Sequence, residues 1–431
     1  MQIKKDYTQA IDAHWKTPEG FTEVDGKMLP RNYEDEKRTV SELLASEEWK
    51  LPELMVMNDG SPVTAEKWPQ RRKEILDTVM SYGFGFTPEK PEKVDAEILY
   101  SSAGSGSLYS GVVKSYAGKA VSERIMLSFD GPYGRFSFPI QLVRPLYVEN
   151  APVIIALTFR PSLRTLPLGE YIDSNYAPVE EIIDNGFAYV HLCYNDIIQD
   201  GFKETYKEAF VENGMGAVFC KGEERGIDEW GKVGMWAYGA SRVVDYLLTR
   251  DEFDHDCISV AGNSRLGKTA LWCGAVDDRI FASMVNCSGF GGAGLMKGLP
   301  NRLKAFIEQK ADINWWCERV KEPQYLEDAT RLPYDSHFII AAFAPRYISL
   351  VAADGDMARY QLADFMAAAA ASPAFEVQGL KGLVSDNALP HPTVVYNEGH
   401  IGFALRPGSH YFSRWDWNRH MEFVLKHRKK K

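Results

Sequence analysis

The stretch of residues 262–269, Gly-Asn-Ser-Arg-Leu-Gly-Lys-Thr, contains residue types that support two different chemistries. Its glycines, lysine and threonine match the phosphate-loop pattern G-x-x-x-x-G-K-[ST], in which backbone N–H groups and a lysine surround a phosphate. The same stretch places Ser264 between a β-prone run, 257–261, and a helical run, 268–276. A serine between a strand and a helix is typical of the nucleophile of a hydrolase. The pattern therefore supports two hypotheses, a nucleotide site and a hydrolytic serine.

A hydrolytic serine needs a histidine as its base and an acid that orients the histidine, here expected in the chain order serine, acid, histidine. His410 stands in Pro-Gly-Ser-His shortly before the end of the chain, and His400 is a second candidate for the base. Asp354 and Asp356 both follow the apolar run 347–352, which predicts a strand. The residues alone leave both aspartates open as the acid.

The elements that must position these residues follow from the hydrophobic pattern. Residues 1–95 are predicted to form a helical lead-in packed on the main domain, 96–431, with a helix over 68–80. An antiparallel meander is predicted next, with strands at 96–100, 111–116, 120–128 and 136–142. Strands then alternate with helices: strands at 152–158, 187–193, 257–261, 281–285, 347–352 and 393–396, and helices at 179–185, 230–249, 268–276, 338–343, 361–371 and 415–426. This order predicts an α/β fold, a mostly parallel sheet with an antiparallel start.

Composition excludes several classes of partner. The formal charge of −10 disfavours nucleic acid and anionic membranes, and no apolar run reaches the ~18 residues of a membrane span. Six cysteines lie scattered without C-x-x-C spacing, which predicts buried, reduced thiols and no zinc site. No apolar segment follows the first lysines, so we expect a cytoplasmic protein. We expect no cofactor and no metal.

Longer motifs resemble the glucuronoyl esterases, carbohydrate esterase family 15. A nucleophilic serine usually lies in the pattern G-x-S-x-G, with the second glycine two residues after the serine. The motif G-x-S-R-x-G-K is specific to this family among α/β-hydrolases, and it has that glycine three residues after the serine, at Gly267 in this chain. The other similar segments are 236–247, 286–293, 332–337, 344–346, 406–410 and 416–417, and the similarity runs from about residue 65 to 425. The resemblance implies an α/β-hydrolase fold with helices on both faces of the sheet, and it favours the serine hypothesis over a nucleotide site.

That family cleaves the ester between glucuronic acid on xylan and a lignin alcohol with a serine triad and no metal. The resemblance implies that Ser264 is the nucleophile and His410 its base. It implies that Arg265 faces the developing oxyanion beside a backbone N–H, where a fixed cation has its largest effect. Lys268 would donate hydrogen bonds to sugar hydroxyls.

Three positions depart from the family. Some members carry a glutamate where this chain has Cys287, and others place the acid after the next-to-last strand, a position that Asp356 matches with Asp354 as the fallback. Bacterial members have a tryptophan where Ala358 stands. A family glutamate corresponds to Arg302, which would suit a substrate with an additional acidic group. The machinery for hydrolysis is thus similar to the family's, while the sugar pocket is altered.

Three other candidates complete the set. Trp315 and Trp316 are candidates for an aromatic wall of the sugar pocket. His337 follows Asp335 at a predicted helix start and is expected to cap or pack.

The main hypothesis is a serine carbohydrate esterase that cleaves a uronate ester, with a xylan- or uronate-derived oligosaccharide ester as its partner. The alternatives are an O-acetyl esterase acting on xylo-oligosaccharides and a carbohydrate-binding relative weakened by Cys287. The binding-only alternative predicts that Asp356 lies too far from His410 to bond it.

Overall fold

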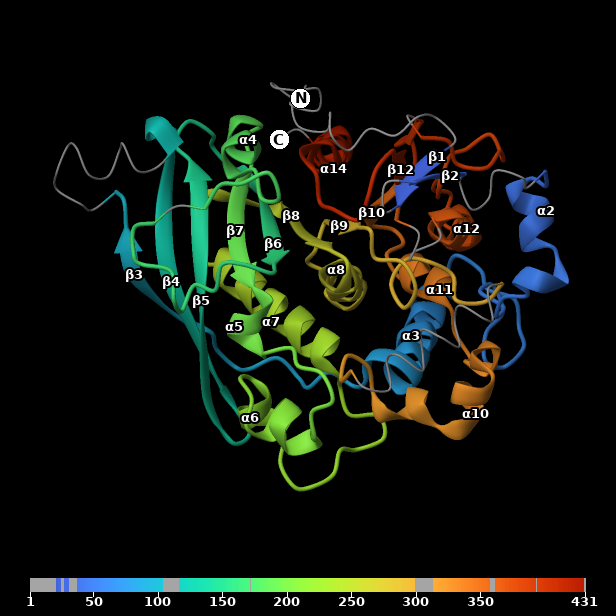
Figure 1. Ribbon diagram of the computed structural model, residues 1–431, viewed down its shortest axis with the longest axis horizontal. Helices are drawn as coiled ribbons and strands as arrows, with labels where there is room; N and C mark the ends of the chain where they lie inside the picture. Colours follow the sequence, from blue (N-terminus) through green and yellow to red (C-terminus); the bar gives the residue numbers. More distant parts are fainter. Residues whose placement is uncertain are drawn as a thin grey trace.

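The computed structural model describes residues 21–24, 27–30, 37–103, 116–170, 172–298, 313–356, 361–392 and 394–429. Its centre is a ten-stranded sheet with the order β11-β12-β10-β9-β8-β6-β7-β5-β4-β3 (Figure 1). The strands are β3 (Asp95–Ser101), β4 (Ala120–Gly131), β5 (Gly134–Pro145), β6 (Ala151–Thr158), β7 (Ala188–Cys193), β8 (Phe253–Asn263), β9 (Ala282–Asn286), β10 (Tyr347–Ala353), β11 (Val395–Tyr396) and β12 (Ile401–Arg406).

The middle of the sheet is parallel and its ends are antiparallel. Strands β12, β10, β9, β8, β6 and β7 pair in parallel, whereas β5, β4 and β3 continue the sheet antiparallel and β11 pairs antiparallel with β12. Every residue of β6 is buried, which is typical of a parallel strand covered on both faces. This arrangement confirms the predicted parallel sheet with an antiparallel start.

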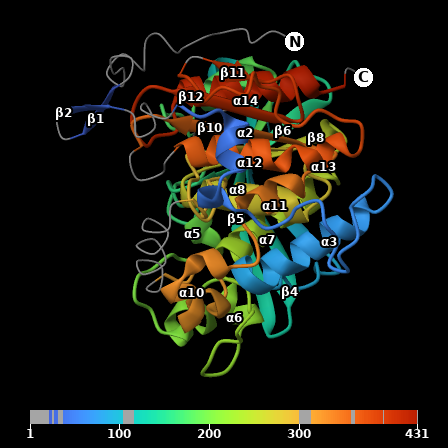
Figure 2. The same ribbon diagram turned by 90° about the vertical axis from the view of Figure 1, so that its right-hand side faces the viewer.

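Helices cover both faces of the sheet (Figures 1 and 2). One face carries α7 (Lys232–Leu247), α8 (Arg265–Val276), α11 (Ser336–Ala341) and α12 (Gln361–Ala371), and the other carries α4 (Val179–Asp184) and α14 (Arg414–His427). Successive side chains of a strand point to opposite faces, so β6 contributes to two cores. Val153 and Ile155 join the larger cluster, while Ile154 and Ala156 join the cluster beneath α4 and α14.

The N-terminal segment shares the larger core. Helix α3 (Trp68–Val79) packs on α11, and the indole N–H of Trp68 donates to the carbonyl oxygen of Ala344 at 3.2 Å. The helix predicted over 68–80 is therefore confirmed, and the boundary predicted at residue 95 stays a prediction. A hairpin of β1 (Phe21–Val24) and β2 (Lys27–Pro30) lies in the lead-in expected to be helical. The sequence between these strands, Asp-Gly, is a strong hairpin signal.

Short helical segments connect these elements. They are α2 (Val40–Leu44), η2 (Glu47–Trp49), η3 (Met80–Phe84), η4 (Tyr116–Gly118), α5 (Tyr194–Ile197), η5 (Lys207–Val211), α6 (Gly216–Phe219), η6 (Glu318–Lys321), α10 (Pro323–Glu327), η7 (Ala329–Arg331) and α13 (Pro373–Glu376).

Other sequence-based expectations differ from the structure or lie beyond it. Strand β12 was not predicted, and α8 begins three residues before the predicted start at 268. Most of the strand predicted at 111–116 lies outside the described residues. All six cysteines are buried thiols, as predicted. Within the described ranges, no helix combines the length and the apolar character needed to cross a membrane.

Candidate active site

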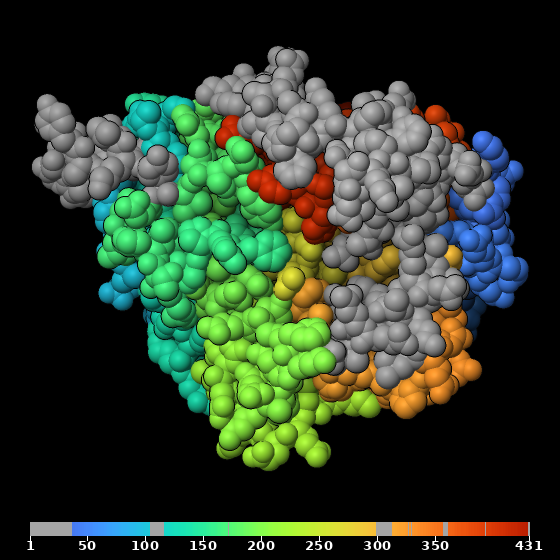
Figure 3. All heavy atoms as spheres, in the orientation of Figure 1, coloured from blue at the N-terminus to red at the C-terminus, as the bar shows by residue number. Residues whose placement is uncertain are grey.

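The candidate residues follow the carboxyl ends of neighbouring parallel strands. Ser264 follows β8, Cys287 follows β9, Asp356 follows β10 and His410 follows β12, and these four strands are adjacent in the sheet. The carboxyl edge of a parallel sheet is where such folds place their functional groups. On the face shown in Figure 3, yellow and red segments of the chain, which carry some of these loops, meet green segments near the centre.

Ser264 occupies a strained turn between β8 and α8. Its backbone has φ 59° and ψ −125°, and its N–H donates to the carbonyl oxygen of Asn286 at 3.0 Å. A Cβ on Gly262 would lie 2.2 Å from the carbonyl oxygen of Leu266, and one on Gly267 would lie 2.8 Å from that of Asn286. Both glycines are thus required by close backbone contacts. A serine on such a turn is the arrangement of a nucleophile elbow.

The histidine and one aspartate form a bonded pair. The ring Nδ1 of His410 donates to Oδ2 of Asp356 at 2.5 Å. Asp354, the fallback acid, instead accepts a hydrogen bond from the backbone N–H of Gly408 at 3.1 Å. The geometry therefore joins Asp356 to the histidine and gives Asp354 a role in holding the loop. The binding-only hypothesis predicted that Asp356 would be too distant, and this prediction is wrong.

A buried ion pair holds the loop that carries His410. The guanidinium of Arg406 donates to Asp416 at 2.7 Å, and burial raises the pKa of the Asp416 carboxyl although Arg406 opposes that shift. Arg406 also donates to three carbonyl oxygens of the loop, those of Pro407, Ser409 and Tyr411. A backbone hydrogen bond also links the turn that carries Asp356 to the turn that carries His410: the N–H of Gly355 donates to the carbonyl oxygen of Gly408 at 2.8 Å.

Cys287 lies beside the histidine–aspartate pair. Its sulfur, a carboxylate oxygen of Asp356 and a ring nitrogen of His410 all lie within 4.8 Å of one another. The Cys287 side chain is buried, and burial, followed by the charge of Asp356, raises the pKa of its thiol well above the usual range. The position that carries a glutamate in some similar proteins thus holds a neutral thiol here.

Arg265 is fixed by an aspartate and a tryptophan. One terminal nitrogen of its guanidinium donates to Asp200, whose other oxygen accepts from the indole N–H of Trp315 at 2.8 Å. The guanidinium lies 4.7 Å from the centre of the Trp315 ring and 5.7 Å from that of Phe159. Its Nε is buried and, within the described part of the chain, has no hydrogen-bond partner. Asp200 was not identified from the sequence, because no pattern links it to a residue 65 positions later.

The structure does not support the prediction that Trp315 and Trp316 form an open aromatic wall of a sugar pocket. Trp315 and Trp316 are each only 5% exposed, and their ring centres lie 5.6 Å apart. Trp315 supports Arg265 with its face and Asp200 with its N–H, so the structure places it behind the arginine and not as an open surface for a sugar. Arg302 and Ala358 lie outside the described residues.

Lys268 is 0% exposed, and its ammonium donates to the carbonyl oxygens of Ser288 and Phe290. A phosphate-loop lysine must instead reach a phosphate, so this position contradicts the nucleotide hypothesis. The ammonium holds the segment after β9, and a contact with sugar hydroxyls stays a prediction.

His400, the second candidate for the base, lies elsewhere. It precedes β12 and so stands at the opposite edge of the sheet from Ser264. Its ring stacks on Tyr347 at 4.4 Å, and its Nδ1 bonds the carbonyl oxygen of Pro345 at 2.8 Å. The structure therefore separates His400 from the serine.

His337 packs in the core as expected, and Asp335 caps α11. Burial lowers the pKa of His337 to about 4, and the charges of Lys297 and Arg71 act in the same direction. The folded protein therefore resists protonation of this ring, so its contribution to stability is complete above pH 6.5 and is lost as pH falls from 6.5 towards 4.

We expect the free energy of unfolding of the wild type to fall by about 3 kcal/mol more than that of His337→Gln between pH 6.5 and pH 4. Urea unfolding at several pH values measures the difference. Burial also raises the pKa of Asp335 to about 6, and this shift makes the folded protein more stable as pH falls. Both proteins contain Asp335, so its effect cancels in the comparison. Parallel stability curves for the two proteins would contradict this account of His337.

A cavity of about 400 Å³ adjoins the site. Phe159, which contacts Arg265, and Tyr176 belong to its lining. The Tyr176 ring packs against Tyr411, the neighbour of His410, at 5.7 Å. The remaining lining residues are Arg160, Pro161, Leu166, Ile172, Asp173, Ser174 and Ala177. Through Phe159 and Tyr176, the lining of this cavity contacts both Arg265 and the neighbour of His410.

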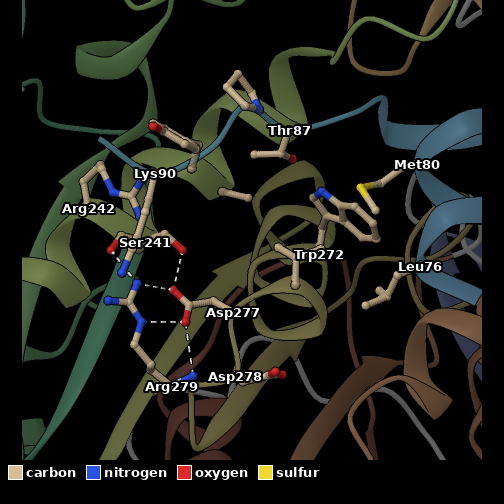
Figure 4. A pocket seen from close by; sticks show the side chains of 15 residues that line it. Leu76, Met80, Thr87, Lys90, Ser241, Arg242, Trp272, Asp277, Asp278 and Arg279 are labelled. Carbon is tan, nitrogen blue, oxygen red and sulfur yellow. Dashed lines mark hydrogen bonds and ion pairs between the residues drawn. The ribbon is translucent and has the colours of Figure 1, made fainter. Parts of the chain in front are cut away.

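A second cavity, of about 470 Å³, lies at the other end of α8 (Figure 4). Helix α8 has 12 residues, so its two ends are separated by roughly 18 Å. Ser241 donates to Asp277 at 2.5 Å, and Arg279 bridges Asp277 and Asp245. The lining residues Asp277 and Arg279 are thus paired, and the cavity is separate from the serine.

A strained serine turn and a bonded histidine–aspartate pair at the carboxyl edge of a mostly parallel sheet define the class of serine α/β-hydrolases. The family model described as "Glucuronyl esterase, fungi" matches residues 221–379. The chain is therefore similar to the glucuronoyl esterases, as the sequence motifs predicted.

Individual relatives agree with this identification. The chain is 28% identical over 417 residues to "Carbohydrate esterase MZ0003" from an unknown prokaryotic organism, covering 88% of this chain and 90% of the relative. It is 30% identical over 308 residues to "4-O-methyl-glucuronoyl methylesterase" of Schizophyllum commune, covering 69% of this chain and 65% of that relative. Among solved structures, a glucuronoyl esterase from Solibacter usitatus superposes with a TM-score of 0.73 at 26% identity, covering 87% of this chain and 97% of that one.

Proposed function

We propose that this protein is a carboxylic ester hydrolase that cleaves an ester of a uronic acid through an acyl-serine intermediate. The single observation that carries the proposal is the bond between His410 and Asp356, which lie in two loops at the same sheet edge as the strained Ser264. The similarity to glucuronoyl esterases supports a uronate as the acyl group.

In the first half of the reaction, the hydroxyl oxygen of Ser264 attacks the ester carbonyl carbon. His410 takes the hydroxyl proton through Nε2, since its Nδ1 is bonded to Asp356. The carboxylate holds the ring in this orientation and stabilises the imidazolium as it forms. The carbon–oxygen bond to the alcohol then breaks, and His410 returns the proton to the departing alcohol.

In the second half, a water molecule attacks the acyl-serine. His410 accepts a proton from this water, and the bond between the acyl carbon and Ser264 breaks as the serine oxygen regains a proton. The products are the free uronic acid and the restored serine. The adjacent cavity lined by Phe159 and Tyr176 provides space for parts of the substrate beyond the reacting carbon.

Two donors of Arg265 suit the oxyanion. Its backbone N–H is the first of α8, and the first N–H groups of a helix have no intrahelical partner. Its guanidinium supplies the second donor, because the side chain is 35% exposed and the bond to Asp200 uses only one terminal nitrogen. Donors that are fixed before the reaction stabilise the charge of the tetrahedral intermediate without reorganisation.

Replacing Arg265 by Gln is expected to lower kcat by about 10²- to 10³-fold, the usual effect of removing one oxyanion donor. Steady-state kinetics on a uronate ester should show a smaller change in KM, since the charge appears only in the transition state. Arg135→Gln is a matched control, because Arg135 is a partly exposed arginine of β5 that pairs with Asp95 and Asp130. An Arg265→Gln enzyme with unchanged kcat would remove this residue from the mechanism.

The substrate class is tested with paired substrates, a methyl ester of glucuronic acid and acetylated xylo-oligosaccharides. The proposal predicts hydrolysis of the uronate ester, with Ser264→Ala protein as the blank. Hydrolysis of acetates alone would favour the O-acetyl esterase alternative. Binding of the sugar without turnover of either substrate would favour the binding-only alternative. The predicted cytoplasmic location is a separate proposal, and it favours a small soluble ester over a polymer.

A further inference from the structure

Cys287 completes a set of three side chains that differs from an ordinary triad. Its sulfur lies within 4.8 Å of both a carboxylate oxygen of Asp356 and a ring nitrogen of His410, and the aspartate and histidine themselves are hydrogen-bonded at 2.5 Å. The three residues come from loops after β9, β10 and β12 and are far apart in the sequence. No short metal-binding motif predicts their meeting.

Thiolate, imidazole and carboxylate are the three ligand types that Zn²⁺ takes in proteins, at about 2.0–2.3 Å. Around a tetrahedral zinc ion such ligand atoms lie roughly 3–4 Å apart. The observed spacing therefore needs shifts of only about 1 Å. We propose that Cys287, Asp356 and His410 form a site for Zn²⁺, and that its occupation inhibits the enzyme.

The backbone holds the three residues in place. The N–H of Cys287 donates to Val351 O at 2.8 Å, and that of Asp356 donates to Ala353 O at 3.0 Å. Arg406 clamps the His410 loop through three carbonyl oxygens. The ligands thus come from rigid positions, so little order is lost when the ion binds.

The exposure of the three proposed ligands to solvent indicates how the ion enters the site. The His410 side chain is 35% exposed, whereas Asp356 and Cys287 lie almost fully buried behind it. An ion therefore arrives at the histidine first, and a fourth position remains for water, as in zinc sites with three protein ligands. Binding deprotonates the thiol: Zn²⁺ and the Cys287 S–H give a zinc–sulfur bond and one proton, which passes to solvent.

Occupation removes two groups that the proposed mechanism uses. A ring nitrogen of His410 and an oxygen of Asp356 become metal ligands. When that nitrogen is Nδ1, its proton moves to Nε2, so the histidine can no longer take the proton of Ser264. The inhibition is reversed when a chelator withdraws the ion. The binding itself does not depend on hydrolysis.

Cobalt(II) tests the site directly, because a thiolate ligand gives cobalt a charge-transfer absorption in the near ultraviolet. We expect this band when Co²⁺ is added to wild type and to Ser264→Ala, and its loss in Cys287→Ala and Cys287→Ser. Cys220→Ala is the matched control, since Cys220 is another buried cysteine, outside the site. The band in Ser264→Ala keeps the test valid even if the proposed esterase activity is absent.

Zn²⁺ inhibition gives the second readout. Each protein is compared with its own rate without metal, and the half-inhibitory concentration should rise at least about tenfold in Cys287→Ala but not in Cys220→Ala. Equal zinc sensitivity in Cys287→Ala and wild type, together with no cysteine-dependent cobalt band, would overturn the proposal. A band that persists in both Cys287 variants would overturn it as well.

Discussion

Replacing Ser264 by Ala is expected to lower kcat for a uronate ester by at least about 10⁴-fold. The hydroxyl oxygen forms the bond to the acyl carbon in the proposed mechanism, and nothing at an alanine can replace it. The stability of the protein should change little, because both residues have a Cβ and must adopt the same positive φ of 59°. Steady-state hydrolysis and thermal unfolding of the variant measure the two effects.

Ser385→Ala is the control for this substitution, because Ser385 lies exposed in a loop between α13 and β11. We expect wild-type hydrolysis from it. Substantial hydrolysis by purified Ser264→Ala would mean that another group attacks the ester.

Replacing Asp356 by Asn is expected to lower kcat about 10⁴-fold, as in other triads whose acid becomes an amide. An amide can present its NH₂ group to the Nδ1 of His410, which favours the wrong tautomer, and it carries no charge to stabilise the imidazolium. Asp354→Asn is a closely matched control, two residues away. Asp354 accepts from Gly408 N–H, and an amide oxygen can accept the same bond.

The two aspartate variants should therefore separate clearly in kcat, with Asp354→Asn affecting mainly stability. pH–rate profiles of both variants add a readout that a purely structural defect would not move. Equal losses in the two variants, with unchanged pH profiles, would contradict the assignment of Asp356 as the acid.

The hydrophobic pattern predicted most of the elements that position the site. Helix α12 lies at the predicted residues, and β6, β9 and β10 match within one residue, because their apolar runs are long or clearly periodic. Strand β12 was missed although it leads directly to His410. Its six residues contain Gly402 and end in Arg406, and the role of Arg406 as a clamp appears only after the loop folds over it.

The triad candidates could be predicted because their order in the chain is a property of the fold. Residues that follow adjacent parallel strands must meet at one edge, whatever lies between them. The choice between Asp354 and Asp356 could not be predicted, because it depends on which side of one turn faces the histidine.

Side-chain environments were the least predictable part. The sequence pattern around Lys268 fits a phosphate loop as well as a hydrolase turn. Only the burial of the Lys268 ammonium against two carbonyl oxygens distinguishes the nucleotide hypothesis from the serine hypothesis. Trp315 was expected to face a sugar, yet it supports Arg265 from behind. The contacts of Asp200 and the position of Cys287 join distant segments, which periodicity and motif spacing do not describe.

The most direct test of the central claim is to trap the acyl-enzyme. Wild-type protein is mixed with a methyl glucuronate ester, quenched in acid within the first turnovers and analysed by peptide mass spectrometry. We predict a mass increase equal to one uronyl group on the peptide that contains Ser264, and none in Ser264→Ala. Turnover of the ester with no adduct on that peptide, or with the adduct on a different residue, would contradict the account.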